Sequence, residues 1–150
     1  MPNIPIARKV VKECLQVKED EQVLIQTWDH TLDLSDSLSQ EVYEVGAIPF
    51  VNLTTQNSFL NYFTTLPEKY YGKTPRAMLS LLDQIDAQIV LFGPKDPKVL
   101  TMASGERFSK SFESEKPVME EVARAKNPDS VPPRGLHHPR TRPELRFRPV

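Results

Sequence analysis

The chain has 150 residues, of which 39% are hydrophobic and 26% charged, and its formal net charge is -1. This length is sufficient for one domain with a buried core. Apolar runs are too short to cross a bilayer, and charges interrupt the first of them, which argues against a membrane protein and a secretory signal. The single cysteine, Cys14, excludes an internal disulfide. We therefore expect a cytoplasmic globular protein.

Charge is divided unevenly along the chain. Residues 1–126 carry 14 Lys and Arg against 18 Asp and Glu, whereas residues 127–150 carry five arginines against two acidic residues. The same C-terminal stretch contains six prolines. A change of composition of this kind predicts a domain boundary. We expect an acidic domain over residues 1–126 and a basic, proline-rich, disordered tail over residues 127–150.

The first predicted element is a helix that begins near Pro5, because proline fits the first turn of a helix. Apolar residues recur at helical spacing and would form its buried face: Ile6, Val10, Cys14 and Val17, with Val11 and Leu15 beside them. On this face Cys14 is a small core residue rather than a nucleophile, since no histidine lies near it in the sequence to activate it.

Two predicted strands enclose the second predicted helix. The strands are the runs "VLIQTW" at residues 23–28 and "AIPFVNL" at residues 47–53. Between them Leu34, Leu38 and Val42 recur at helical spacing, and Gly46 would end the helix. A strand, a helix and a strand with short links predict parallel pairing with a right-handed crossover.

Helices and strands continue to alternate over the remainder of residues 1–126. Residues 54–86 are mostly helical and divided by prolines, and "AQIVLFG" at residues 87–93 predicts a third strand. Residues 97–126 predict two helical pieces, with breaks near Gly105 and Pro117. The expected fold is therefore α/β: a layered domain with a mainly parallel sheet of at least three strands, helices packed on it, and an irregular tail.

Ligands of such sheets usually bind beyond the carboxyl ends of the strands, which here read "TWDH", "NLTTQN" and "FGPKDP". No GxGxxG or GxxxxGK[ST] loop is present, which argues against dinucleotide and P-loop sites. Asp29 and His30 are the one pair that could orient a reacting group or bind a metal. We favour another interpretation, in which Asp29 or Thr31 caps the following helix and His30 is solvated. One histidine without a second ligand makes no metal site.

Other polar and aromatic residues also favour structural roles. Glu120 and Glu121 are interpreted as an exposed helix face. Trp28, Tyr70 and Tyr71 are expected to pack in the core or at its rim. A stacking platform for the bases of a single-stranded nucleic acid would also need a basic groove, and none accompanies them.

The tail contains the pair His137 and His138, followed directly by Pro139. Adjacent histidines cannot form a helical chelate with i, i+4 spacing, so metal binding there would be weak. The five arginines could attract phosphates, but prolines prevent a recognition helix. We assign no catalytic, cofactor-binding or metal-binding residue, and we expect no specific nucleic-acid or membrane partner.

Four stretches of the body resemble a known family: "ARKVVKECLQVKEDEQVLIQT", "LSQEVYEVGAIPFVNL", "TPRAMLSLLDQIDAQIVLFG" and "SGERFSKSFESEKPVMEEV". Together they resemble the N-terminal region of the aminopeptidase T/aminopeptidase S family of metallo-aminopeptidases, the thermophilic metalloproteases. The resemblance covers roughly residues 6–126 and is most specific at "VKEDEQVLI" and "EVGAIPFV". Asp20 departs from the pattern, since the family often has glycine there.

The resemblance implies a longer cytoplasmic enzyme, typically a dimer, that removes N-terminal residues from peptides. Two divalent metal ions (zinc, cobalt or similar) would polarise the peptide carbonyl and activate a water. The family's metal ligands lie in a C-terminal half that has no counterpart here, so no catalytic residue is carried over. The resemblance therefore implies the N-terminal domain of a truncated metal-dependent aminopeptidase, inactive alone and without a cofactor of its own. Self-association or a homodimer is an open possibility.

Two alternatives remain. The chain could be a non-catalytic interaction module whose basic tail adds electrostatic attraction to a partner. It could also be the N-terminal part of a related iron-dependent ring-opening dioxygenase, whose deciding residues would again lie C-terminally. For the tail we hypothesise a frameshift or truncation, against an ordinary disordered extension. We prefer the aminopeptidase interpretation, because its resemblance runs through residues 6–126. The interaction-module interpretation depends only on the composition of the tail.

Overall fold

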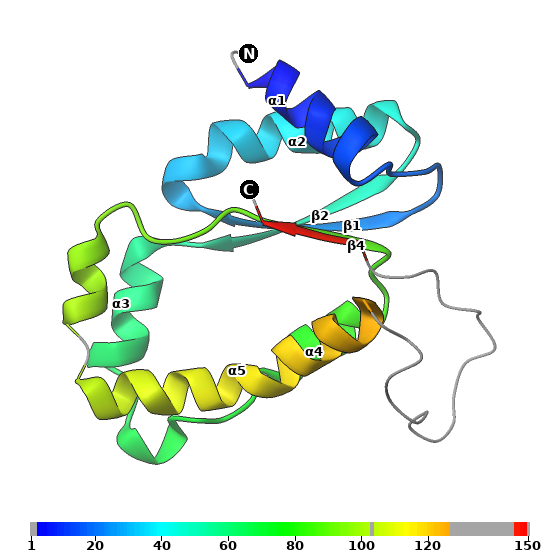
Figure 1. Cartoon of the computed structure of the whole chain (residues 1–150). Coiled ribbons are helices and arrows are strands. Elements are labelled where there is room, and N and C mark those ends of the chain that lie inside the picture. Colours follow the sequence, from blue (N-terminus) through cyan, green and yellow to red (C-terminus); the bar gives the residue numbers. More distant parts are fainter. Residues whose placement is uncertain (1–2, 103, 127–145, 150) are drawn as a thin grey trace.

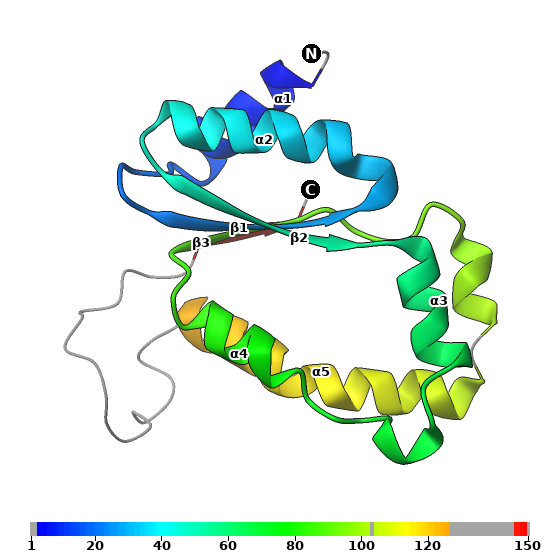
Figure 2. The ribbon, with the colours of Figure 1, turned by 180° about the vertical axis from the view of Figure 1, so that it is seen from behind.

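The computed structural model describes residues 3–102, 104–126 and 146–149. Helices cover both faces of a four-stranded sheet, as Figures 1 and 2 show from opposite sides. None of the helices in the described part of the chain is long and apolar enough to cross a membrane. The elements, in chain order, are α1 (Ile4–Arg8), the π-helical turn η1 (Lys9–Cys14), β1 (Gln22–Trp28), the 3-10 turn η2 (Asp29–Thr31), α2 (Leu32–Glu44), β2 (Ile48–Thr54), α3 (Gln56–Thr64), η3 (Glu68–Tyr70), α4 (Arg76–Leu82), β3 (Ala87–Val90), η4 (Pro97–Thr101), α5 (Gly105–Lys126) and β4 (Arg146–Pro149).

The strands are ordered β2-β1-β3-β4, and every neighbouring pair is parallel. This confirms the layered α/β fold and the parallel pairing expected from the three strand-like runs. The fourth strand was not expected, because β4 lies in the stretch interpreted as an irregular tail. Residues 127–145 and 150 of that stretch lie outside the described residues.

Two hydrophobic cores lie on the two faces of the sheet, because successive side chains of a strand point to opposite sides. Val23 and Ile25 of β1 are fully buried in a core with residues of α1 and α2. Leu24 is fully buried on the other face, where it packs with Leu82 and Ile85 between the sheet and α4. Both faces of the central strand are thus covered, as the continuous apolar run "VLI" predicts.

The first helix buries a different face from the one expected. Ile6 is 53% exposed, whereas Ala7 is fully buried. The chain turns more widely after Arg8, and the Leu15 N–H donates to the Val10 carbonyl five residues earlier, at 2.9 Å. A π-helical turn shifts the positions that face the core relative to a regular α-helix. Cys14 is half-buried, in agreement with a packing role.

A buried carboxylate joins α1 and η1 to α2. The side chain of Glu41 is fully buried, and its oxygens lie 3.1 Å from Arg8 Nη2 and 3.1 Å from Lys12 Nζ. Burial acts to raise the pKa of Glu41, but the hydrogen bonds and charges of Arg8 and Lys12 outweigh it, so that this pKa lies below its ordinary value. The ion pairs fix how the first helical segment lies on α2.

Two residues that precede β1 and β2 have left-handed backbone conformations. Gly46 has φ +79°, in agreement with its expected role in ending α2. Asp20 has φ +64°, and its N–H donates to the Gly46 carbonyl at 3.0 Å. The position at which the family often has glycine is therefore one whose conformation favours glycine.

Aromatic side chains hold α3 against α5. Phe63 of α3 is 3% exposed, and its ring lies 5.0 Å from that of Phe59 and 6.1 Å from that of Phe108. The series continues from Phe59 to Trp28 at the end of β1, at 5.4 Å. These contacts form a small packing unit apart from the two cores, at the end of the molecule where Figure 1 shows α3.

The break expected at Pro117 is absent from α5, which runs without interruption from Gly105 to Lys126. A proline inside a helix removes one backbone donor and clashes with the preceding turn, which is why a break was expected. Here packing compensates for this cost, because Val118 is partly buried against the core around Leu24 and Leu82.

Candidate functional site

Polar side chains gather at the carboxyl ends of the first three strands. Asp29 and His30 follow β1, Gln56 and Asn57 follow β2, and Lys95 follows β3. These five residues line an open depression of about 380 Å³. Parallel strands bring their carboxyl ends to the same edge of the sheet, so this is the place that the sequence predicts for a ligand site.

Asp29 links two of these strand ends. Its Oδ2 accepts a hydrogen bond from the Gln56 N–H at 3.3 Å, and its Oδ1 accepts one from the His30 N–H at 3.0 Å. A carboxylate near the free N–H groups of a helix start is favourable, and here the helix is α3. Gln56 in turn accepts a hydrogen bond from the Asp96 N–H through its Oε1, at 3.4 Å. The three strand ends are thereby tied together.

Thr31 occupies the N-cap position of α2, as one of the two expected alternatives, but neither Asp29 nor Thr31 makes a side-chain cap hydrogen bond to that helix. Asp29 contacts the start of α3 instead, and α2 has no side-chain cap. Thr31 Oγ1 accepts a hydrogen bond from the Trp28 N–H and lies within hydrogen-bond distance of the Trp28 carbonyl, at 3.0 Å in each case. The reason is the 3-10 turn η2, which the sequence pattern did not indicate and which directs Thr31 back onto the end of β1.

His30 lies beside Asp29 but makes only a loose pair with it. His30 Nδ1 is 3.6 Å from Asp29 Oδ1, and the centre of its ring is 6.4 Å from that of Trp28. His30 is exposed, as expected, with 25% of its side chain accessible. The pair could hold a polar group at the edge, where Lys95 also lines the depression.

The residues of this edge do not fit the two divalent ions that the family resemblance implies. Within residues 3–102, 104–126 and 146–149, no group of three or more His, Cys, Asp or Glu side chains could hold a metal ion. Asp29 and His30 together supply only two ligands. His137 and His138 lie outside the described residues, as does the side chain of Glu121, whereas Glu120 is exposed on α5 as expected.

The aromatic residues singled out in the sequence pack as expected. Trp28 is half-buried against Phe59. Tyr71 is 8% exposed and donates its hydroxyl hydrogen bond to the Tyr62 carbonyl at 2.8 Å. Tyr70 lies at the rim, 40% exposed.

A parallel sheet with helices on both faces and polar groups at the carboxyl ends of its strands defines a layered α/β domain. The chain belongs to the thermophilic metalloprotease (M29) family, because the model of that family matches residues 5–139. This match continues past residue 126, where we expected the domain to end. No curated protein matches the chain.

Among solved structures, wild-type AmpT from Thermus thermophilus is similar, with a TM-score of 0.68 and 18% sequence identity. The similarity covers 82% of this chain and 32% of the AmpT chain. At this identity the likeness shows the fold. The present chain thus spans about a third of the length of the AmpT structure that it matches.

Proposed function

We propose that this chain supplies the N-terminal domain of a metal-dependent aminopeptidase, an enzyme that removes N-terminal residues from peptides. Its metal ions are held by polypeptide outside these 150 residues, and the domain alone is inactive. Membership of the thermophilic metalloprotease family over residues 5–139 carries this proposal. The shared fold with AmpT, over about a third of that protein's length, supports it.

The domain's role in such an enzyme is to shape one side of the active-site cleft and to contribute to assembly. In such an enzyme residues outside these 150 would hold the metal ions, zinc, cobalt or similar, and the ions would supply Lewis-acid chemistry for peptide hydrolysis. The polar edge around Asp29 and Lys95 is the part of the domain best suited to border a cleft, since it lies at the carboxyl ends of the strands. We further propose a cytoplasmic location and a domain boundary near residue 126.

A peptidase assay tests the proposal. The purified chain is incubated with short unblocked peptides, with and without zinc, cobalt or manganese, and released amino acids are measured by mass spectrometry. A full-length family member serves as the positive control. We expect the chain to release no amino acids in a metal-dependent way, so that a chelator makes no difference to the result.

Chelator-sensitive turnover by the chain alone would contradict the proposal. In that case a double variant, Asp29→Ala with His30→Ala, shows whether the polar edge is responsible. Loss of turnover in this variant would assign the activity to the described edge, and retained turnover would assign it to residues outside the described part of the chain.

A further inference from the structure

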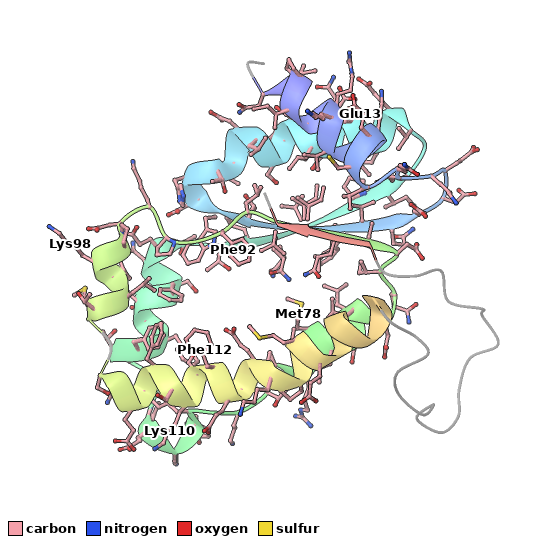
Figure 3. All side chains as sticks on the ribbon, viewed as in Figure 1. Glu13, Met78, Phe92, Lys98, Lys110 and Phe112 are labelled. Carbon is pink, nitrogen blue, oxygen red and sulfur yellow. The ribbon has the colours of Figure 1, made fainter. Side chains whose placement is uncertain are left out.

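The face of the sheet that lies towards α5 is only partly packed. Around Leu24 it forms a core with Leu82 and with the partly buried Val118 of α5. Phe50 of β2 is in register with Leu24, so its side chain lies on the same face, but it is 49% exposed. Phe92 follows β3 and is 66% exposed, and Figure 3 shows it on the side of the sheet that faces α5. The core on this face therefore ends before it reaches these two phenylalanines.

The opposing surface of α5 is also apolar and open. Residues at helical spacing share one face of this helix: Phe108, Phe112, Glu115 and Met119. Phe108 directs this face towards α3, because its ring stacks on that of Phe63 with 6.1 Å between the ring centres. Phe112 is 50% and Met119 54% exposed, and Figure 3 shows Phe112 on the side of α5 that faces the sheet. The sheet and α5 thus present apolar side chains to each other without burying them.

One carboxylate lies within this apolar stripe of α5. Glu115 is one helical turn from Phe112 and one from Met119. Burial raises the pKa of Glu115 above its ordinary value. None of the ion pairs between side chains that the structure describes includes Glu115. A carboxylate that is partly removed from water is stabilised when a cation pairs with it, so the group that covers this stripe should supply a lysine or an arginine.

We infer that a polypeptide segment from outside these 150 residues packs between the sheet and α5. It covers the inner surface, which we define as Phe50, Phe92, Phe112, Glu115 and Met119. Apolar side chains of the segment contact the phenylalanines and Met119, and a lysine or arginine of the segment pairs with Glu115. The inference rests on the proposed function, in which this chain is one domain of a longer enzyme. The AmpT chain contains such further polypeptide, since the similarity covers 32% of it.

Other occupants suit the inner surface less well. A two-fold interface between two copies uses the same surface on both, and the inner surface contains a carboxylate but no cation to pair with it. A substrate peptide leaves after each turnover and would expose the apolar side chains to water again, which favours aggregation. A segment of the same enzyme stays in place and keeps these side chains covered.

Binding of synthetic peptides tests the inference. Short fluorescein-labelled peptides that overlap along the whole AmpT sequence are titrated with the whole chain, and fluorescence polarisation measures their affinity. We expect binding by peptides that combine apolar residues with a lysine or arginine. Glu115→Lys should weaken their binding about tenfold, because it brings two like charges together. The same peptide with its basic residue replaced by glutamate should bind Glu115→Lys better than wild type, a result that misfolding of the variant cannot produce.

Glu113 provides the matched control, because it is exposed on another face of the same helix. Glu113→Lys should change peptide affinity by less than about twofold. Absence of binding by every peptide, or binding that Glu115→Lys leaves unchanged, would overturn the inference. So would a dimer in sedimentation that Glu115→Lys dissociates, since a second copy would then cover the inner surface. These results would leave the proposed function standing, which fails instead if the chain alone shows chelator-sensitive peptide turnover.

Discussion

Asp20 shows how one residue can depart from a family pattern at a cost. Its φ of +64° lies in the left-handed region, which is unfavourable for a residue with a Cβ atom and less so for aspartate than for most. We predict that Asp20→Gly raises the free energy of unfolding by up to about 1 kcal/mol, because the relief of backbone strain exceeds the added freedom of the unfolded chain. Urea unfolding measures this change.

The neighbouring residue provides the control for this substitution. Glu19 does not have a positive φ, so Glu19→Gly should lower the free energy of unfolding by about 0.5–1 kcal/mol. If both substitutions destabilised the protein equally, the left-handed conformation of Asp20 would not be the cause.

Glu41 stabilises the protein in a way that depends on pH. Its oxygens contact Arg8 and Lys12 while its side chain is fully buried. Because its folded-state pKa is lowered, the stabilisation is fully present above the unfolded pKa of about 4.5 and is lost as the pH falls through the folded pKa. We predict that Glu41→Gln lowers the free energy of unfolding by about 1–3 kcal/mol at pH 7.

The pH profile identifies this ion pair. The difference in unfolding free energy between wild type and Glu41→Gln should shrink as the pH falls below about 4.5. Glu44 is a suitable control, since it contacts Lys12 at 3.4 Å with its side chain 40% exposed. Glu44→Gln should change stability by less than about 1 kcal/mol. A wild-type to Glu41→Gln difference that stays constant between pH 3 and pH 7 would contradict this account.

The sequence carries a sign of this buried charge. Glu41 falls on the stripe formed by Leu34, Leu38 and Val42, which a helical wheel places against the core. Arg8 and Lys12 are four residues apart on the first helix and so share one face. Only the packing of the two helices shows that these three residues meet.

At the scale of elements, α3 and α5 depend on their aromatic contacts. Phe63 is 3% exposed and lies 6.1 Å from Phe108, ring to ring. We predict that Phe63→Ala lowers the free energy of unfolding by about 3 kcal/mol, since it leaves a cavity between the two helices. The fluorescence of Trp28, the one tryptophan of the chain, should report the change, because its ring lies 5.4 Å from that of Phe59.

Phe92 provides the comparison for Phe63. It is 66% exposed, and Figure 3 shows its position beside the sheet. Phe92→Ala should therefore change the free energy of unfolding by no more than about 0.5 kcal/mol. Equal effects of the two substitutions would show that the aromatic contacts do not hold α3 on α5.

Local patterns predicted some elements better than others. β1 and α2 were located within a residue or two, because an apolar run and a helical stripe specify them locally. The uninterrupted course of α5 through Pro117 and the pairing of β4 with β3 could not be predicted in this way. Both depend on contacts with parts of the fold that are distant in sequence.

At the scale of the whole molecule, the parallel topology predicted where polar groups would gather but not how they would bond. Asp29 was correctly placed at the carboxyl end of a strand, yet it contacts α3 rather than α2. This bond depends on how β2 ends beside β1, which no local pattern encodes. The carboxyl-end site could thus be predicted from the order of the elements, and its hydrogen bonds only from the structure.

We propose that this chain is the N-terminal domain of a metalloprotease and does not itself hold the catalytic metals. The most direct test is calorimetric titration of zinc and cobalt into the whole chain after treatment with a chelator. We predict no tight binding of either ion. Two tight sites per chain would contradict the claim and would place the metal centre within these 150 residues.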